Sequence, residues 1–355
     1  LIYMDVQQKI SSDVSFWKRT FSRDSFLFTK EAAITLVGLA IFGFFTYKAP
    51  YFAQFGNVMD IARYSAFVAI VGVGWTFLII SEELDLSIGP AYSFCQVMCA
   101  WFIVGPGLDP MVAFFGAILV GAFIGATNGF IVTVLRVPSF VVTLGMLAVM
   151  MGASLTMTGH HPITVPRDTE TILFGLANGK IGPIPAQFFW MVGVCLVGGF
   201  VLHKTKFGYQ VFATGGNEKA ARQAGINTKR VKFLCFVITG AMVGLCGALS
   251  VGWIRTTSPV GNQLFTIQVI SAVIVGGAAL SGGAGSVYGT VVAAFILGML
   301  STGLIMMGAN VDVTFILFGS LIIVVGTLYI VIQHGQTVFI TKLRQLIKGR
   351  DNINK

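Results

Sequence analysis

Long apolar stretches dominate the chain, and short polar segments separate them. An apolar helix of about 20 residues crosses a hydrocarbon core roughly 30 Å thick, and these stretches have about that length. The pattern therefore predicts an all-α membrane protein, a polytopic bundle of about ten transmembrane helices. Two of the spans, 66–81 and 265–280, are short, which is typical of broken or re-entrant helices. The expected spans are residues 31–48, 66–81, 88–105, 110–134, 138–158, 187–203, 231–254, 265–280, 287–308 and 314–333.

Composition agrees with the span pattern. Of the 355 residues, 55% are hydrophobic and only 10% are charged, whereas a soluble domain carries roughly 25% charged residues. The formal net charge of +9 lies in short loops between apolar segments rather than on one helix face, which argues against a nucleic-acid partner. The 43 glycines suit a helical bundle, because small residues let membrane helices approach closely. The expected surroundings are therefore a lipid bilayer.

The distribution of basic residues predicts the orientation of the spans. With ten spans both termini lie on one side, and that side carries all Lys and Arg except Lys48, Arg63, Arg167, Lys180 and Arg255. Loops rich in Lys and Arg stay in the cytoplasm. Both termini are therefore expected to be cytoplasmic.

The chain shows no internal repeat and no linker, so we expect one membrane domain. It comprises an N-terminal segment 1–30, a transmembrane domain 31–333 with its longest cytoplasmic loop at 204–230, and a cytoplasmic tail 334–355. Within the first segment, residues 11–30 mix aromatic and basic side chains before the first span. An interfacial helix on the cytoplasmic surface and a solvated basic tail are the two interpretations.

The cytoplasmic loop at 204–230 contains a predicted short helix. Asn217 is a good N-cap after Gly215-Gly216, and Glu218 in the first turn suits the helix dipole. Glu218 and Arg222 are four residues apart in the favourable order, and Gly225 is placed to end the helix. Ala220, Ala221 and Ala224 give it a small-residue face. Such a helix can dock in a groove of a partner protein, or it is an ordinary solvated loop helix.

Four segments carry a family resemblance. The run GGNEKAARQAGI at 215–226 resembles the cytoplasmic coupling motif of ribose-type sugar permeases, the membrane subunits of bacterial ABC importers. The segments ELDLSIG at 83–89, VPSFVVTLG at 137–145 and GGAALSGGAGS at 276–286 resemble three further signatures of that family in the same order. One departure concerns Glu83-Leu84, because the family commonly has Gly before Asp-Leu-Ser, so the local charge of this chain differs there.

The resemblance implies the ABC importer permease fold and an ATP-driven import mechanism with alternating access. The implied partners are two cytoplasmic ATPase subunits that bind ATP and Mg, a second permease copy or sister permease, and a periplasmic or lipid-anchored binding protein. The implied cargo is a sugar or sugar-like solute, and the implied location is the inner membrane of a bacterium. The ATPase-coupling residues would be Gly215, Gly216, Asn217, Glu218, Ala220, Ala221, Arg222 and Gly225.

Acidic and glycine-rich residues between the spans have two interpretations. Glu82, Glu83 and Asp85 fall at the predicted cytoplasmic boundary, where charge costs little; Asp85 either caps the next helix or serves gating or a partner contact. The run from Gly276 lacks the Gly-Lys-Ser/Thr ending of a P-loop, so a tight turn with close packing is the better interpretation. The residues assigned to gating or structure are Asp85, Leu86, Ser87, Gly276, Gly277, Gly282 and Gly283.

No catalytic, cofactor or metal site is expected in this chain. The Gly179-Lys180 pair is followed by Ile181 rather than Ser or Thr, so ATP hydrolysis would belong to a partner. Cys95 and Cys99 share a helix face but have no His or acid beside them. An intramembrane enzyme would need a nucleophile with a base, and no His lies in mid-span.

Neutral polar and aromatic residues within the spans are the candidates for the substrate pathway. Hydroxyl, amide and aromatic groups suit an uncharged polyol, which needs hydrogen bonds but no counter-ion. Interhelical hydrogen bonding is the competing interpretation for each. The alternative function is a secondary transporter driven by an ion gradient, which would need ionisable groups in mid-membrane. The pathway candidates are Phe123, Thr127, Asn128, Ser139, Phe140, Thr143, Phe265, Gln268 and Ser271.

Overall fold

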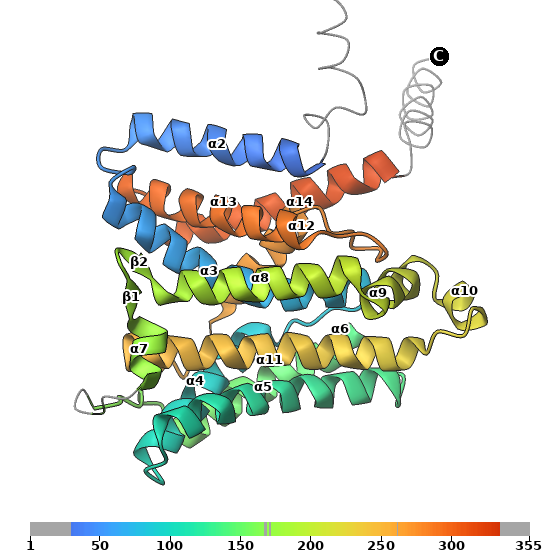
Figure 1. Cartoon of the computed structure of the whole chain (residues 1–355), viewed down its shortest axis with the longest axis horizontal. Helices are drawn as coiled ribbons and strands as arrows, with labels where there is room; N and C mark the ends of the chain where they lie inside the picture. The colour runs from blue at the N-terminus through green and yellow to red at the C-terminus, as the bar shows by residue number, and fades with distance from the viewer. Residues whose placement is uncertain (1–29, 167–168, 170–171, 261, 334–355) are drawn as a thin grey trace, which may run out of the picture.

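A computed structural model describes residues 30–166, 169, 172–260 and 262–333. The predicted segment 1–29, with its interfacial helix, and the tail 334–355 lie outside the described residues. Long helices run side by side through the molecule (Figure 1). They are α2 (Lys30–Lys48), α3 (Phe55–Ile80), α4 (Ile88–Val104), α5 (Pro110–Thr133), α6 (Ser139–Thr158), α8 (Ala186–Lys204), α11 (Thr228–Ile254), α12 (Gln263–Val275), α13 (Val287–Met306) and α14 (Asp312–Gln333).

Short elements lie at the two ends of this bundle. At one end are α7 (Ile172–Asn178) and a small antiparallel pair, β1 (Lys180–Ile181) and β2 (Ile184–Pro185), in which Lys180 faces Pro185. At the other end are α9 (Lys206–Gly216) and α10 (Glu218–Gln223). The first residue of α2 and the last of α14 lie at the α10 end (Figure 1), as an even number of spans requires.

The structure confirms an all-α polytopic membrane protein. In the part of the chain that the structure describes, seven helices are long and apolar enough to cross a membrane, and three shorter apolar helices cover 88–104, 264–275 and 312–328. These ten coincide with the ten predicted spans. One expectation was wrong: the span predicted at 66–81 is part of α3, which runs unbroken for 26 residues. Helix α12, by contrast, has only 13 residues, too few to cross the bilayer alone.

Helix α3 forms the centre of the bundle. In the most apolar window of α3, 89% of the residues are buried, compared with 17% in the corresponding windows of α2 and α6. Helix α3 packs against α8, α11, α12 and α13. Helices α5 and α11 make the closest contact. A methyl group on Gly125 of α5 would lie 2.9 Å from the carbonyl carbon of Phe236 in α11. Glycine therefore fixes this interface, as small residues do in membrane helix pairs.

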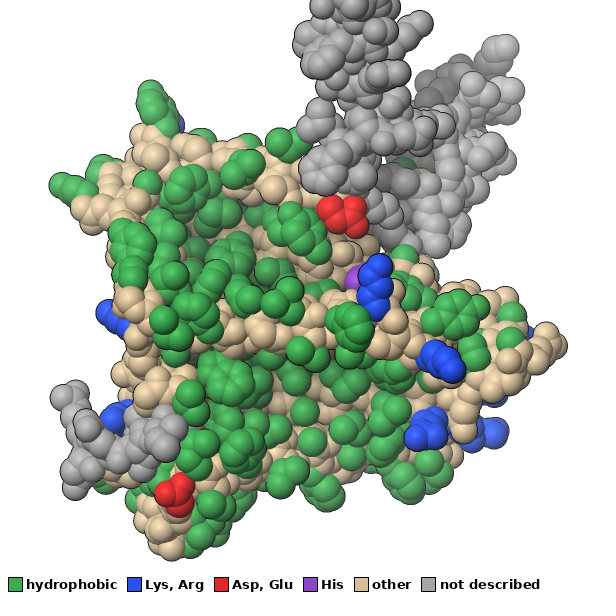
Figure 2. Space-filling view, viewed as in Figure 1, with side chains coloured by type: hydrophobic (Ala, Val, Ile, Leu, Met, Phe, Trp, Pro, Cys, Tyr) green, Lys and Arg blue, Asp and Glu red, His purple; other side chains and the backbone are tan. Residues whose placement is uncertain are grey.

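Side-chain colouring of the surface separates an apolar band from two polar ends. Figure 2 shows hydrophobic side chains over the faces of α8 and α11, with Lys and Arg gathered at the α10 end. This is the distribution expected for a protein whose middle lies in hydrocarbon and whose ends lie in water.

Cysteine labelling tests the orientation. In Lys180→Cys and Lys219→Cys variants, both at exposed positions, a membrane-impermeant maleimide should label position 180 in intact cells and position 219 only after permeabilisation. The reason is that the basic residues of the α10 end predict a cytoplasmic position for it. The native cysteines are buried or half-buried, so the unsubstituted chain is the background control. Equal labelling of both positions in intact cells would contradict the ten-span topology.

Candidate functional site

The segment between α8 and α11 folds as the sequence indicates. The side chain of Asn217 caps α10 by accepting a hydrogen bond from the backbone N–H of Ala220 at 3.0 Å. The chain leaves α10 through Gly225, whose φ of +82° is a conformation that favours glycine. Ala221 is buried, whereas Ala220 and Ala224 are exposed. Helix α10 therefore projects from the end of the bundle with one face anchored and one face free (Figure 1).

A chain of charged side chains ties α10 to the bundle. Glu218 pairs with Arg222 within α10, and its second carboxylate oxygen lies 3.3 Å from the Nζ of Lys232 in α11. The same Nζ donates to Glu83, just beyond the end of α3, at 2.7 Å. Thr228 donates to Glu218 at 3.0 Å and accepts from the Nε of Arg222 at 2.9 Å. The departure at Glu83 thus supplies the charge that binds Lys232.

The network keeps Glu218 ionised. Burial by itself raises the pKa of Glu218, but the Lys232 charge and the hydrogen bonds from Thr228 and Arg222 outweigh it, so that the net pKa is lowered. Lys232 and Glu83 are each only 11% exposed at the side chain. Their pair is therefore a shielded contact between α11 and the end of α3, rather than a solvated surface pair.

Two glycine pairs meet beside this network. The N–H of Gly283, in the loop between α12 and α13, donates to the carbonyl of Ile80 at 2.9 Å. A methyl group on Gly215 would overlap with that same carbonyl oxygen and lie 2.8 Å from the Gly283 nitrogen. Gly282 and Gly283 both have positive φ. The end of α9, the end of α3 and the α12–α13 loop therefore meet backbone to backbone at what we name the glycine junction (Gly215, Gly216, Gly282, Gly283 and Ile80).

The remaining glycines of the run pack α13. A methyl group on Gly276 would lie 2.5 Å from the backbone nitrogen of Thr290, and Gly277 has a φ of +90°. The interpretation as a tight turn with close packing agrees with this geometry.

Asp85 lies deeper than the sequence suggested. The prediction placed Glu82, Glu83 and Asp85 at the membrane boundary, but only Glu82 is exposed, and Asp85 is 4% exposed. The segment after Ile80 turns back along α3, since the indole N–H of Trp75 donates to the carbonyl of Asp85 at 3.0 Å. That return fold, which hydropathy alone does not reveal, carries the carboxylate inward.

The carboxylate of Asp85 binds Ser87, the N-cap residue of α4, but the Ser87 side chain makes no capping hydrogen bond to α4 itself, so Asp85 holds the N-cap residue rather than capping the helix. It accepts from the backbone N–H of Ser87 at 2.8 Å and from the Ser87 hydroxyl at 2.6 Å. The amide of Asn128 in α5 donates to the other oxygen at 3.4 Å. The signature segments 83–89 and 137–145 are in contact here, because Leu84 donates its N–H to the hydroxyl of Ser139 at 3.3 Å. Leu86 is partly buried beside these contacts.

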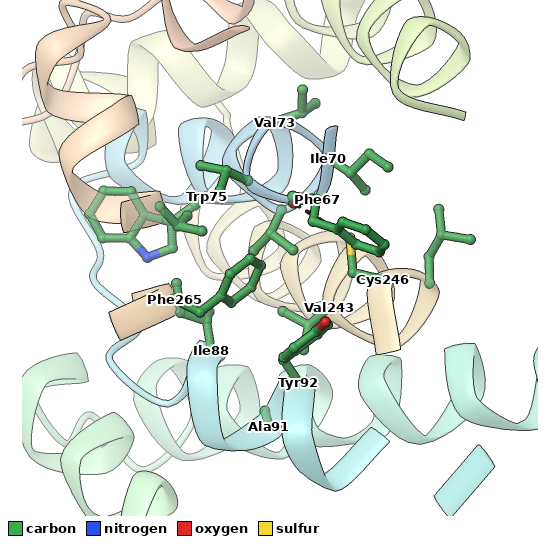
Figure 3. Close-up of a cluster of buried hydrophobic side chains, with 14 of the residues drawn as sticks. Phe67, Ile70, Val73, Trp75, Ile88, Ala91, Tyr92, Val243, Cys246 and Phe265 are labelled. Atoms are coloured by element: carbon green, nitrogen blue, oxygen red, sulfur yellow. Dashed lines mark hydrogen bonds between the residues drawn. The ribbon is translucent and has the colours of Figure 1, made fainter. Parts of the chain in front are cut away.

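The first turns of two interrupted helices meet inside the bundle. The backbone N–H of Gly89 in α4 donates to the hydroxyl of Thr266 in α12 at 3.0 Å. Tyr92 stacks on Phe265 with ring centroids 4.6 Å apart, and Figure 3 shows both rings in the cluster with Ile88 and Ala91. The prediction that span 265–280 is interrupted agrees with this arrangement.

The predicted pathway residues line neither the cavity between α8 and α11 nor the small one beside Gly276. The hydroxyls of Thr127, Thr143 and Ser271 donate hydrogen bonds to backbone carbonyls of their own helices. The side-chain amide of Gln268 donates to the hydroxyl of Tyr64. Phe123 and Phe140 are exposed on the outside of the chain, at 73% and 54%. Asn128, Ser139 and Phe265 hold α4 in place through the contacts above. Interhelical and intrahelical hydrogen bonding thus accounts for most of these polar groups in the single chain.

Sequence reasoning missed Lys232 and Thr228. Both lie at the start of α11, where a basic residue and an N-terminal threonine are unremarkable in a sequence. Lys232 binds Glu83, which is 149 residues away, and Thr228 binds Glu218, which is 10 residues away. No local sequence pattern links either pair.

Comparisons with known proteins identify the family. A family described as the permease component of a branched-chain amino acid transport system matches residues 57–326. The chain is 31% identical over 293 residues to the ribose import permease protein RbsC of Escherichia coli, covering 82% of this chain and 90% of that protein. It is 31% identical over 308 residues to the fructose import permease protein FrcC of Rhizobium meliloti, covering 84% and 85%.

A third relative and the solved structures complete the comparison. The ribose import permease protein RbsC of Bacillus subtilis is 32% identical over 262 residues, covering 74% of this chain and 80% of that protein. No solved structure matches significantly. The chain therefore belongs to the transport-system permease family that includes the ribose and fructose import permeases.

Proposed function

We propose that this permease is the membrane subunit of an ATP-driven importer for a sugar or sugar-like solute, in the inner membrane of a bacterium. Its relatives import ribose and fructose by their names. The observation that supports coupling to an ATPase is the way α10 is attached. It projects from the bundle, and ion pairs and the glycine junction bind it to the ends of α3, α11 and α12.

The proposed mechanism is alternating access driven from α10. Two cytoplasmic ATPases bind ATP and Mg, close on one another and move α10. The Glu218–Lys232–Glu83 contacts and the glycine junction are stiff, because shielded charges and backbone contacts leave little room for relative motion. The displacement therefore passes to α3, the central helix, and to the α12–α13 loop. The chain itself hydrolyses nothing.

Besides the ATPases, the assembly would include two other kinds of partner. A second permease copy or a sister permease completes the pore, and a periplasmic binding protein delivers the solute at the β1 end. Basic residues concentrate at the α10 end (Figure 2), which supports a cytoplasmic position for α10 and for both termini.

The proposed solute contacts lie where α4 and α12 begin. Interrupted helices with N-terminal ends at membrane depth are where transporters hold their substrates. The groups available there are hydroxyl, amide and aromatic, among them Thr266, Asn262 and Tyr92. Such groups suit an uncharged polyol. The buried Asp85 is committed to hydrogen bonds with Ser87, just before α4, which disfavours a proton-relay role and with it the secondary transporter.

Gentle purification tests the proposal. The tagged chain from its native membrane should carry an ATPase with Walker motifs in about equal amount, and the complex should take up solute in proteoliposomes only with ATP. A chain that purifies alone and transports in response to a sodium or proton gradient would identify a secondary transporter instead.

A charge-reversed variant tests the docking role of α10. In Glu218→Arg with Arg222→Glu, the new arginine faces Lys232, so repulsion replaces attraction and α10 should shift. We expect the ATPase to be lost from the purified complex and ATP-driven uptake to fall at least about tenfold, with the permease still in the membrane. The matched control is Lys219→Glu, an exposed change in the same helix. Normal uptake by the reversed variant would refute the assignment.

A further inference from the structure

A long apolar groove runs along the membrane-facing side of the chain. Helices α8 and α11 both pack against α3, yet among the described residues they make no substantial contact with each other. The space between them is a cavity of about 790 Å³. Val73 and Phe77 of α3 form its floor, and Phe189, Val197, Ile238 and Met242 line its sides. We name this cavity the α8 groove.

Glycine keeps part of the hollow open. Of the glycines that line the α8 groove, Gly175 and Gly193 face open space, whereas Gly179 and Gly198 allow close packing against Gly175 and Val73. A methyl group on Gly193 would have no atom within 4 Å, so the space above it is open. The indole of Trp190 is fixed as part of the wall, because its N–H donates to the carbonyl of Leu176 at 3.0 Å. The groove is therefore a built feature of the fold rather than a gap that side chains could close.

The length and the lining of the groove suit a hydrocarbon chain. Its lining on α8 extends from Ala186 to Val201, which at 1.5 Å per residue is about 22 Å. Among its lining residues only Lys180 carries a charge, and the side chains along α8 and α11 are apolar. A groove of this length with an apolar lining suits extended acyl chains.

Charge at one end indicates the headgroup. Lys180 lines the groove at the β1 end, where the bundle meets water, and it has no ion-pair partner among the described residues. An ammonium group at the interface attracts the phosphate of an anionic lipid. We propose that the α8 groove binds one anionic phospholipid of the leaflet at the β1 end, with its acyl chain along Gly193 and its phosphate at Lys180.

Retention of lipid by the purified full-length permease tests this proposal. The probe is a vesicle of equal parts phosphatidylglycerol and phosphatidylethanolamine, followed by detergent extraction, exhaustive washing and mass spectrometry of the intact protein. We expect about one retained phosphatidylglycerol per chain. Gly193→Leu fills the groove with a side chain and should lower retention at least about tenfold, since the displaced chain loses several buried methylenes.

The controls separate this site from ordinary boundary lipid. Gly152→Leu makes the same change on α6, at an exposed glycine with no atom within 4 Å of an added methyl group, and should retain lipid like the parent chain. Lys180→Gln should keep the acyl chain but lower the preference for phosphatidylglycerol about fivefold. Equal retention in Gly193→Leu and Gly152→Leu, or no retained lipid in the parent chain, would overturn the site. An unchanged preference in Lys180→Gln would overturn the headgroup assignment.

The lipid site requires only that the chain lies in a membrane, and it does not depend on the transport mechanism. Loss of lipid retention with intact ATP-driven uptake would leave the proposed function standing, and the reverse result would leave the lipid site standing.

Discussion

Replacing Gly215 with valine is expected to abolish solute uptake. The first atom of any side chain at this position overlaps with the carbonyl oxygen of Ile80, and it lies 2.8 Å from the nitrogen of Gly283. Both obstacles are backbone atoms, which cannot rotate away as a flexible side chain would. The glycine junction must therefore separate, and the hydrogen bond from Gly283 to Ile80 at 2.9 Å is broken with it. Overpacking of this kind costs about 1–3 kcal/mol or more.

The adjacent glycine provides a matched control. A methyl group on Gly216 would have no atom within 4 Å, so Gly216→Ala should change stability by no more than about 0.5 kcal/mol and leave uptake close to normal. The measurement is solute uptake and ATP hydrolysis by the reconstituted complex, with membrane insertion checked for each variant. For Gly215→Val we expect at least about tenfold lower uptake and residual ATP hydrolysis that solute no longer stimulates. Equal uptake by the two variants would show that the junction transmits nothing.

The sequence predicted the spans well because hydropathy and length are local properties. All ten apolar helices fall on predicted spans. The main error, at the start of α3, has a local cause: Asn57, Asp60 and Arg63 lower the hydropathy there although the helix continues. The structure gives each of them a partner in place, since Asn57 donates to the carbonyl of Phe52 at 2.7 Å, and Arg63 pairs with Asp60 at 3.1 Å and lies over the Trp253 ring, although its Nε is buried without a hydrogen bond.

The candidate site was only half predictable, for a physical reason. Contacts within α10 depend on residues three or four apart, so the cap by Asn217 and the Glu218–Arg222 pair could be deduced from spacing. Contacts that bind α10 to the bundle connect distant segments, and the depth of Asp85 depends on a return fold after Ile80. Folding alone brings Lys232 to Glu83, or Gly215 to Gly283, and neither pair has a signature in one sequence.

The Lys232–Glu83 pair gives the second large expected effect. Among the described residues Lys232 is the only ion-pair partner of Glu83, at 2.7 Å, and both side chains are 11% exposed. Lys232→Met removes the charge and leaves Glu83 shielded and alone, whereas Glu218 keeps Arg222 and Thr228. Removing one partner of a buried pair typically costs 3–5 kcal/mol, and the remaining exposure places this case near the lower end, at about 3 kcal/mol. The permease should therefore unfold at a lower temperature and lose ATP-driven uptake.

A second variant separates stability from transmission. In Lys232→Met with Glu83→Gln no charge is left unpaired, so the thermal midpoint should return most of the way to that of the parent chain. Uptake should not return, because the ionic link from Glu218 of α10 through Lys232 to the end of α3 is still broken while the ATPase continues to hydrolyse ATP. The control for charge alone is Lys229→Met, an exposed position one turn earlier in α11 with no ion pair to a described residue. If the double variant recovers uptake together with its stability, the pair only holds the fold, and the glycine junction must carry the movement of α10 by itself.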